Sequence, residues 1–255
     1  MIEKFKITIP QLTGRRKKRR VYIYLPDSYD EDPERRYPVL YMFDGQNVFF
    51  DKDATYGKSW GLKEYLEYTD TQLIVAAVEC NNNNHNGRLN EYAPFAFEDE
   101  EFGHVKGMGR KTMDWLVNEF KPQVDVSYRT LPFRETTFIA GSSMGGLMTL
   151  YALACYNDYF SRGAALSPSF EAGPGRILSM LRRADMNPDT VVYMDFGEQE
   201  FEREGMRQCF AKATSIMIEK GLRVNARIIP DGDHSEASWE RQNEFYISTL
   251  MYGLE

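Results

Sequence analysis

The sequence predicts an α/β fold in which a mostly parallel central sheet is covered by helices on both faces. Short apolar runs rich in β-branched residues alternate along the chain with longer segments of helical periodicity. Hydrophobic residues make up 42% of the chain and charged residues 27%, which is ordinary for a soluble globular protein. The sequence has no internal repeat and no linker rich in Pro, Gly or Ser, so we expect a single domain over residues 1–255.

The first two predicted strands form an N-terminal antiparallel hairpin. Residues 5–9 (FKITI) and 21–26 (VYIYLP) are rich in β-branched and aromatic residues, and the basic run Arg15–Arg20 lies between them. We expect a hairpin turn that exposes this basic run to solvent. Because the net charge of the chain is −7, we expect no basic face for nucleic-acid binding.

Apolar runs mark the remaining strands, and periodic apolar positions mark the helices. The expected strands are 37–43, 73–79, 136–140, 163–167, 190–196 and 223–229. The expected helices pass through Trp60–Leu66 and Met113–Phe120, begin at Gly145, span Glu204–Lys220 with Gly221 as C-cap, and close the chain. The long loop between 81 and 109 is typical of a lid, a substrate loop or a disordered segment.

The cysteines and the N-terminus bear on the cellular compartment. Cys80, Cys155 and Cys209 are far apart in the sequence and form no CxxC pair, so we expect reduced thiols. Cys155 falls in an apolar helical run and is expected in the core. The first ten residues contain no apolar segment typical of a signal peptide. We therefore expect a cytoplasmic protein.

The uncharged segment from Thr136 to Asn157 raises the question of a membrane span, because its length is sufficient by residue count. Its first part is β-branched, its second part favours helix, and glycines and serines interrupt it in between. This pattern predicts a strand, a tight turn and a helix. We expect no contact with a membrane.

The turn in this segment matches the G-x-S-x-G pattern, with Ser143 as the central serine between Gly141 and Gly145. In the nucleophile elbow of α/β-hydrolases, a strand turns so sharply into a helix that the residues two before and two after the serine nearly touch. Glycine at those positions avoids a clash. The helix N-terminus also directs amide groups toward the serine oxygen. The sequence therefore predicts Ser143 as a nucleophile.

A serine hydroxyl needs a base to take its proton. The chain has three histidines: His85 in the asparagine-rich loop, His104 after an acidic cluster, and His234 after the last predicted strand. The position after the last strand is where an α/β-hydrolase places its base. We expect His234 to be the base.

The base in turn needs a carboxylate that fixes its orientation. Asp195, Glu198 and Glu200 lie at or just after the strand 190–196, and the chain order serine, acid, histidine then matches the α/β-hydrolases. The residue pattern alone leaves these three carboxylates open.

The second oxyanion donor is expected in the turn Asp44-Gly45-Gln46-Asn47, which follows the strand 37–43. The backbone amides of Gln46 and Met144 would together form the oxyanion hole. The sequence has no HExxH motif, and we expect neither a metal nor another cofactor.

These motifs together resemble the Putative esterase (esterase D-like) family of α/β-hydrolases, which includes enterochelin esterases, feruloyl and acetylxylan esterases and S-formylglutathione hydrolases. The resemblance is carried by four stretches of this chain and extends over most of its length. They are YPVLYMFDGQNVF, SYRTLPFRETTFIAGSSMGGLMTLYA, AALSPSF and DGDHSEASW.

The resemblance implies an α/β-hydrolase fold and a role for each matched position. The family pattern of a glycine, two variable residues and an acid matches Gly197 to Glu200, so it implies Glu200 as the acid. The turn DGQN differs from that of most S-formylglutathione hydrolases, which favours siderophore or carbohydrate esters as substrates. Asn47, Trp60 and Arg88, with Trp239, are candidates to line the substrate cleft; both tryptophans also suit the core.

The leading hypothesis is a serine esterase that cleaves a small-molecule carboxylic ester through an acyl-enzyme. Acyl transfer to a sugar or another alcohol is an alternative, and so is a binding module that has lost catalysis. A complete set of Ser143, Glu200 and His234 argues against the last. The acyl group, the leaving group and the oligomeric state are left open by the sequence.

Overall fold

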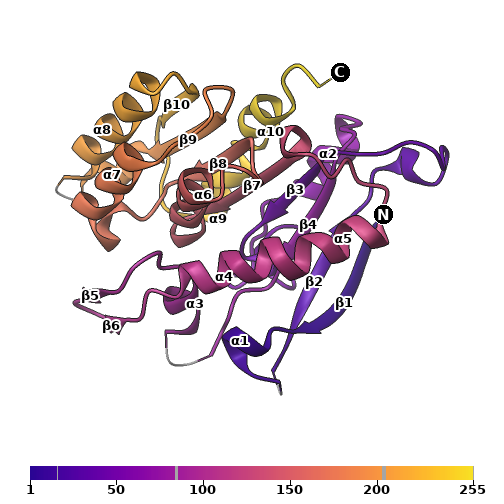
Figure 1. The fold of residues 1–255 in the computed structure, drawn as a ribbon, viewed down its shortest axis with the longest axis horizontal. Coiled ribbons are helices and arrows are strands. Elements are labelled where there is room, and N and C mark those ends of the chain that lie inside the picture. Colours follow the sequence, from indigo (N-terminus) through magenta and orange to yellow (C-terminus); the bar gives the residue numbers. More distant parts are fainter. Residues whose placement is uncertain (16, 84–85, 203–204, 255) are drawn as a thin grey trace.

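The computed structural model describes residues 1–15, 17–83, 86–202 and 205–254. Within these ranges, eight strands form one sheet (Figure 1), and two short strands form a separate hairpin. The sheet contains β1 (Ile2–Thr8), β2 (Lys18–Tyr24), β3 (Val39–Met42), β4 (Ile74–Val78), β7 (Thr137–Ser142), β8 (Arg162–Leu166), β9 (Val191–Gly197) and β10 (Arg223–Ile229). The hairpin contains β5 (Phe97–Asp99) and β6 (Gly103–Val105).

The strand order of the main sheet is β1-β2-β4-β3-β7-β8-β9-β10. β1 and β2 are antiparallel, as are β2 and β4, while every pairing from β4 through β3 to β10 is parallel. The prediction of a mostly parallel sheet with an N-terminal antiparallel hairpin is therefore confirmed.

Helices cover both faces of this sheet (Figure 1). They are α1 (Pro10–Thr13), α2 (Leu62–Tyr68), α3 (Gly87–Glu91), α4 (Gly109–Trp115), α5 (Lys121–Ser127), α6 (Met144–Cys155), α7 (Pro174–Arg183), α8 (Met206–Glu219), α9 (Glu236–Glu240) and α10 (Asn243–Met251). A π-helical turn, Leu116–Phe120, joins α4 to α5.

The core consists of two apolar clusters, one on each face of the sheet. Alternate residues of one strand belong to different clusters, because successive side chains of a strand point to opposite faces. On β3, Val39 and Tyr41 pack with residues of α4, α6, α7 and α8, whereas Leu40 and Met42 pack with residues of α2 and α10. None of the helices in the described ranges combines the length and apolar character that crossing a bilayer requires.

The second half of the basic run Arg15–Arg20 belongs to β2 and is not the solvent-exposed turn that was predicted. Arg19 is buried and donates both of its terminal guanidinium nitrogens to the buried carboxylate of Glu91. Arg20 pairs with Glu79 and Asp53. The prediction failed because each arginine faces a carboxylate that comes much later in the chain. Arg16 lies outside the described residues.

Two further expectations need correction, and one helix was missed. The region from 81 to 109 contains α3 and the β5–β6 hairpin, so it has secondary structure of its own. Helix α7 was not predicted, and it fills the connection between β8 and β9. Cys155 is exposed instead of buried, because it is the last residue of α6, where the helix leaves the core. All three cysteines are free thiols.

Candidate active site

The candidate site lies where the parallel strands of the sheet end. Ser143 follows β7, His234 follows β10, and the turn with Gln46 follows β3. Open α/β sheets place reactive groups at this edge. Ser143, His234 and Gln46 all line one cleft with a volume of about 830 Å³.

Ser143 occupies a strained turn between β7 and α6. Its backbone has φ 58° and ψ −123°, a conformation that a residue with a side chain rarely adopts. A Cβ atom at Gly141 would lie 2.8 Å from the carbonyl carbon of Gly145, so only glycine fits there. The amide of Ser143 donates to the Leu166 carbonyl at 2.9 Å, which ties the turn to β8. This geometry is that of a nucleophile elbow.

The Ser143 hydroxyl is hydrogen-bonded to Ser169. The two Oγ atoms are 3.3 Å apart, and the Ser169 amide donates to the Ser143 carbonyl at 3.1 Å. Within the described residues, Ser143 Oγ has no hydrogen bond to His234, although both side chains line the cleft.

His234 is held by Glu200. Its Nδ1 lies 2.6 Å from Glu200 Oε2, while Glu200 Oε1 accepts hydrogen bonds from Ser167 Oγ (2.6 Å) and the Gly197 amide (2.8 Å). Burial raises the pKa of Glu200, but the hydrogen bonds from His234, Ser167 and Gly197 outweigh this effect and lower the pKa below its ordinary value. The carboxylate is therefore ionised beside the imidazole at neutral pH.

Trp239 completes the surroundings of this pair. Its indole Nε1 donates to Ser167 Oγ at 3.0 Å, and its ring meets the His234 ring edge-on at a centroid distance of 5.1 Å. Ser167 thus connects Trp239 to Glu200. The residue pattern did not single out Ser167 or Ser169 as site residues, although both follow β8, at the edge of the sheet where open α/β folds place reactive groups.

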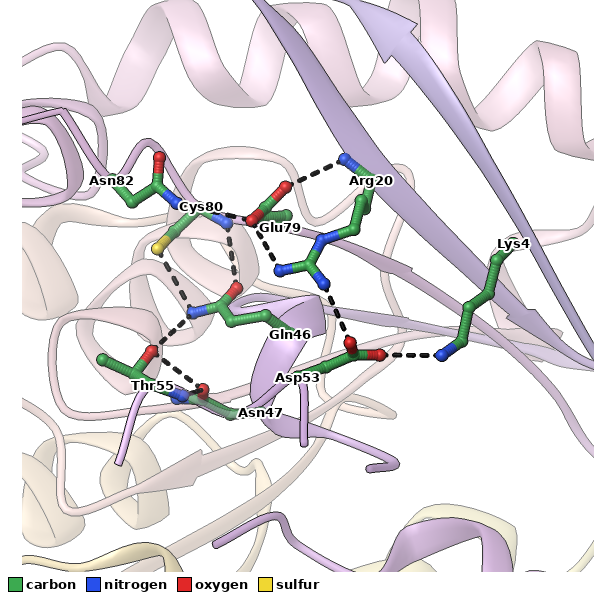
Figure 2. A network of polar contacts seen from close by, with 9 residues as sticks. All are labelled: Lys4, Arg20, Gln46, Asn47, Asp53, Thr55, Glu79, Cys80 and Asn82. Carbon is green, nitrogen blue, oxygen red and sulfur yellow. Dashed lines mark hydrogen bonds and ion pairs between the residues drawn. The ribbon is translucent and has the colours of Figure 1, made fainter. Parts of the chain in front are cut away.

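The predicted oxyanion turn is a 3-10 turn, Gly45–Asn47, after Asp44 in the left-handed region (φ 54°). A Cβ at Gly45 would lie 2.8 Å from the backbone of Val78, so the turn packs directly on β4. Figure 2 shows the Gln46 side chain between Cys80 and Thr55. Its Oε1 accepts from the Cys80 amide at 3.1 Å, and its Nε2 lies 3.3 Å from Thr55 Oγ1.

The family model described as "Putative esterase" matches residues 14–251. The chain belongs to this esterase family. The predicted resemblance is therefore confirmed, and the protein is a hydrolase of esters.

Three relatives of the esterase share between 17% and 24% sequence identity with it. The protein YbbA of Bacillus subtilis (strain 168) is 24% identical over 212 residues, which cover 80% of each chain. An IroE-like serine hydrolase from Shewanella oneidensis has a TM-score of 0.75 at 18% identity, covering 97% of this chain and 81% of that chain. The siderophore hydrolase EstA from Aspergillus nidulans has a TM-score of 0.72 at 17% identity, covering 96% and 93%. At these identities the structures show a shared fold.

Three of the four predicted cleft residues, Asn47, Arg88 and Trp239, line the cleft of the esterase, and the two polar ones are already engaged. Asn47 accepts from the Thr55 amide at 2.9 Å and donates to Glu236 at 3.1 Å. Arg88 is paired with Asp44. Neither side chain offers its main polar group freely to a ligand.

Trp60 does not line the cleft. It is 3% exposed and precedes α2, where its ring packs against Trp239 and Tyr246 at centroid distances of 6.0 Å each. Packing in the core explains why this residue is a tryptophan. Of the two tryptophans considered, only Trp239 reaches the cleft.

The other two carboxylates near β9 do not contact His234. Glu198 accepts a hydrogen bond from the Asp231 amide at 3.4 Å. Asp195 is 1% exposed and accepts from Tyr193 OH at 2.8 Å and from the Ser167 amide at 3.1 Å. Within the described ranges, no group of three or more His, Cys, Asp or Glu side chains is arranged to hold a metal ion.

The burial of Asp195 predicts a pH-dependent effect on stability. Burial raises the pKa of Asp195 from 3.8 to about 7, more than its hydrogen bonds lower it. The folded state then binds a proton that the unfolded state has lost, so stability falls as the pH rises from about 4 to about 7. Asp195→Asn should remove a cost on the order of 4 kcal/mol above that range.

The measurement is urea unfolding of the wild type and Asp195→Asn at pH 4 and pH 8. We expect the free energy of unfolding of Asp195→Asn, minus that of the wild type, to be larger at pH 8 than at pH 4. An equal difference between the two proteins at both pH values would contradict a raised pKa. Glu198→Gln, at a carboxylate that is not buried, is the matched control.

Proposed function

We propose that the esterase is a serine hydrolase that cleaves carboxylic esters through an acyl-enzyme on Ser143. The observation that carries this proposal is the elbow geometry of Ser143 in a cleft that it shares with His234, whose Nδ1 is bound by an ionised Glu200. A strained serine at a helix N-terminus, in one cleft with an oriented imidazole, supports a hydroxyl that the imidazole activates as a nucleophile.

In the proposed first half-reaction, Ser143 Oγ attacks the carbonyl carbon of the ester while His234 Nε2 takes its proton. Glu200 accepts the hydrogen bond of Nδ1–H and stabilises the imidazolium. The carbonyl oxygen becomes an oxyanion that accepts hydrogen bonds from the Met144 and Gln46 amides. The carbon–oxygen bond to the leaving group then breaks as His234 donates the proton to the departing alkoxide.

In the second half-reaction, water takes the place of the leaving alcohol. His234 removes a proton from the water as its oxygen attacks the acyl carbon, and the same two amides stabilise the second oxyanion. Collapse releases a carboxylic acid and returns the proton to Ser143. This sequence needs no group beyond the residues named and water.

The cleft supports a polar ester as substrate, and we propose a siderophore or carbohydrate ester. Tyr56 (81% exposed) and Phe102 (47% exposed) supply aromatic surface, which suits contact with a ring. Amide side chains add hydrogen-bonding groups to the same lining. They belong to Asn81, Asn82, Asn83 and Asn86.

The proposal predicts burst kinetics with p-nitrophenyl acetate. The activated leaving group makes acylation fast, so about one equivalent of nitrophenolate should appear before the slower steady state set by deacylation. Stopped-flow absorbance measures the burst, and intact-mass spectrometry of the quenched reaction should find one acetyl group per chain. Steady turnover without either signal would favour direct attack by water and contradict the acyl-enzyme.

A further inference from the structure

The guanidinium of Arg88 joins the two segments that carry the proposed oxyanion donors. Its Nε and one terminal nitrogen donate to the two carboxylate oxygens of Asp44 at 2.7 and 2.8 Å. The same terminal nitrogen lies 3.4 Å from the carbonyl oxygen of Ser142. Asp44 opens the turn that contains Gln46, and Ser142 precedes the elbow that contains Met144.

Among the described residues, backbone pairing and the close approach of Phe43 and Asp44 to Gly145 also join these two segments. The Gln46 turn follows β3, whereas the elbow follows β7, and the strand pairing between them ends with Met42 opposite Ala140. The Phe43 amide adds one more bond, to the Ala140 carbonyl at 3.0 Å. Beyond that point the Arg88 side chain crosses between the two turns. A bidentate arginine pair fixes orientation as well as distance.

The conformation of Asp44 requires support of this kind. Its left-handed backbone (φ 54°) is unfavourable for a residue other than glycine. The Asp44 amide donates to Tyr92 OH at 3.1 Å, and the Arg88 guanidinium lies 5.3 Å from the centroid of the Tyr92 ring. Arg88 and Tyr92 therefore hold Asp44. Figure 2 shows that Cys80 and Thr55 hold the side chain of Gln46.

We infer that Arg88 is a positioning residue that keeps the Gln46 and Met144 amides at the spacing an oxyanion needs. Its charge is satisfied by Asp44, which is 6% exposed at its side chain, so Arg88 does not act as a receptor for an anionic substrate. A misplaced donor weakens transition-state binding and leaves ground-state binding largely unchanged. This inference rests on the proposed serine mechanism.

The test compares Arg88→Gln, Arg88→Lys, Asp44→Asn and the double variant Arg88→Gln/Asp44→Asn. Arg110→Gln is the matched control, because Arg110 is an exposed arginine paired with Asp114 on α4. Each protein is assayed with p-nitrophenyl acetate for kcat and KM, and with a fluorophosphonate for its labelling rate. Circular dichroism and thermal melting show which variants fold.

We expect Arg88→Gln to lower kcat and the labelling rate by about 10- to 100-fold, somewhat less than deletion of one oxyanion donor, with KM within about twofold. Asp44→Asn should do the same, and the double variant should be no worse than the poorer single variant, because both changes break one unit. Arg88→Lys should recover part of the loss. Arg110→Gln should behave as the wild type.

Additive losses, or a raised KM at unchanged kcat, would overturn the inference and make Arg88 a substrate contact. If Arg88→Gln does not fold, Arg88→Lys and Asp44→Asn decide by the same criteria. Ser143→Ala distinguishes a failure of the serine mechanism from a failure of the positioning role of Arg88. Labelling that persists in Ser143→Ala refutes the serine mechanism itself, whereas labelling lost in Ser143→Ala but normal in the Arg88 variants refutes only the positioning role.

Discussion

Replacement of Ser143 by alanine should lower kcat for p-nitrophenyl acetate by at least about 10⁴-fold while the protein stays folded. Without the hydroxyl no acyl-enzyme can form, and the residual rate would come from water in a site that still has its oxyanion donors. The substitution removes one oxygen whose hydrogen bond, to Ser169, is a long one of 3.3 Å. We therefore expect little change in melting temperature.

Two neighbouring serines supply the controls. Ser142 is adjacent to Ser143 in sequence, and Ser169 Oγ is adjacent to Ser143 Oγ in space. Each therefore tests whether another hydroxyl near this position could act as the nucleophile. We expect Ser142→Ala to keep activity within a few fold of the wild type and Ser169→Ala to lose much less than Ser143→Ala. A loss of 10⁴-fold in Ser169→Ala with Ser143→Ala still active would transfer the nucleophile to Ser169.

Replacement of Glu200 by glutamine should lower kcat by about 10³- to 10⁴-fold with little change in KM. Glutamine keeps the size of the side chain but has no charge to stabilise an imidazolium, and its NH2 group can turn His234 to the wrong tautomer. Glu198→Gln and Asp195→Asn are matched controls. If either control lost more activity than Glu200→Gln, the acid role would belong to that carboxylate.

The same substitution has a predicted effect on stability. Because the pKa of Glu200 is lowered in the folded state, its carboxylate stabilises the fold above the ordinary pKa of a glutamate, and this contribution disappears as the pH falls through the lower value. Glu200→Gln should therefore cost stability at pH 7 and less at pH 3. Thermal melting at the two pH values measures the difference.

Much of this fold could be predicted because local patterns carry it. The strand 223–229 appears as β10 with the same bounds, and the strands and glycines around Ser143 mark the elbow in the sequence itself. The steric reason for glycine at both positions also agrees with the structure, because Gly141 and Gly145 approach each other as closely as the motif requires. These features depend on residues that are near one another in the chain.

The unpredicted features depend on partners that are distant in the chain. The pairing of Arg19 with Glu91 and of Arg88 with Asp44 joins residues 72 and 44 positions apart, which no local pattern indicates. The residue pattern could not distinguish Asp195, Glu198 and Glu200 as the partner of His234, whereas their contacts in the fold differ. His85, one of the three histidines considered, lies outside the described residues. Trp60 shows that a tryptophan near a site motif can belong to the core.

The most direct test of the account is to identify the residue that a fluorophosphonate labels. The probe reacts with a serine only when a base activates it and oxyanion donors receive the phosphoryl oxygen, so it reports the whole proposed machinery at once. Proteolysis and peptide mass spectrometry of the labelled protein should place one adduct on Ser143, and His234→Ala should abolish it. An adduct on Ser142 or Ser169, or labelling that survives His234→Ala, would contradict the proposed mechanism.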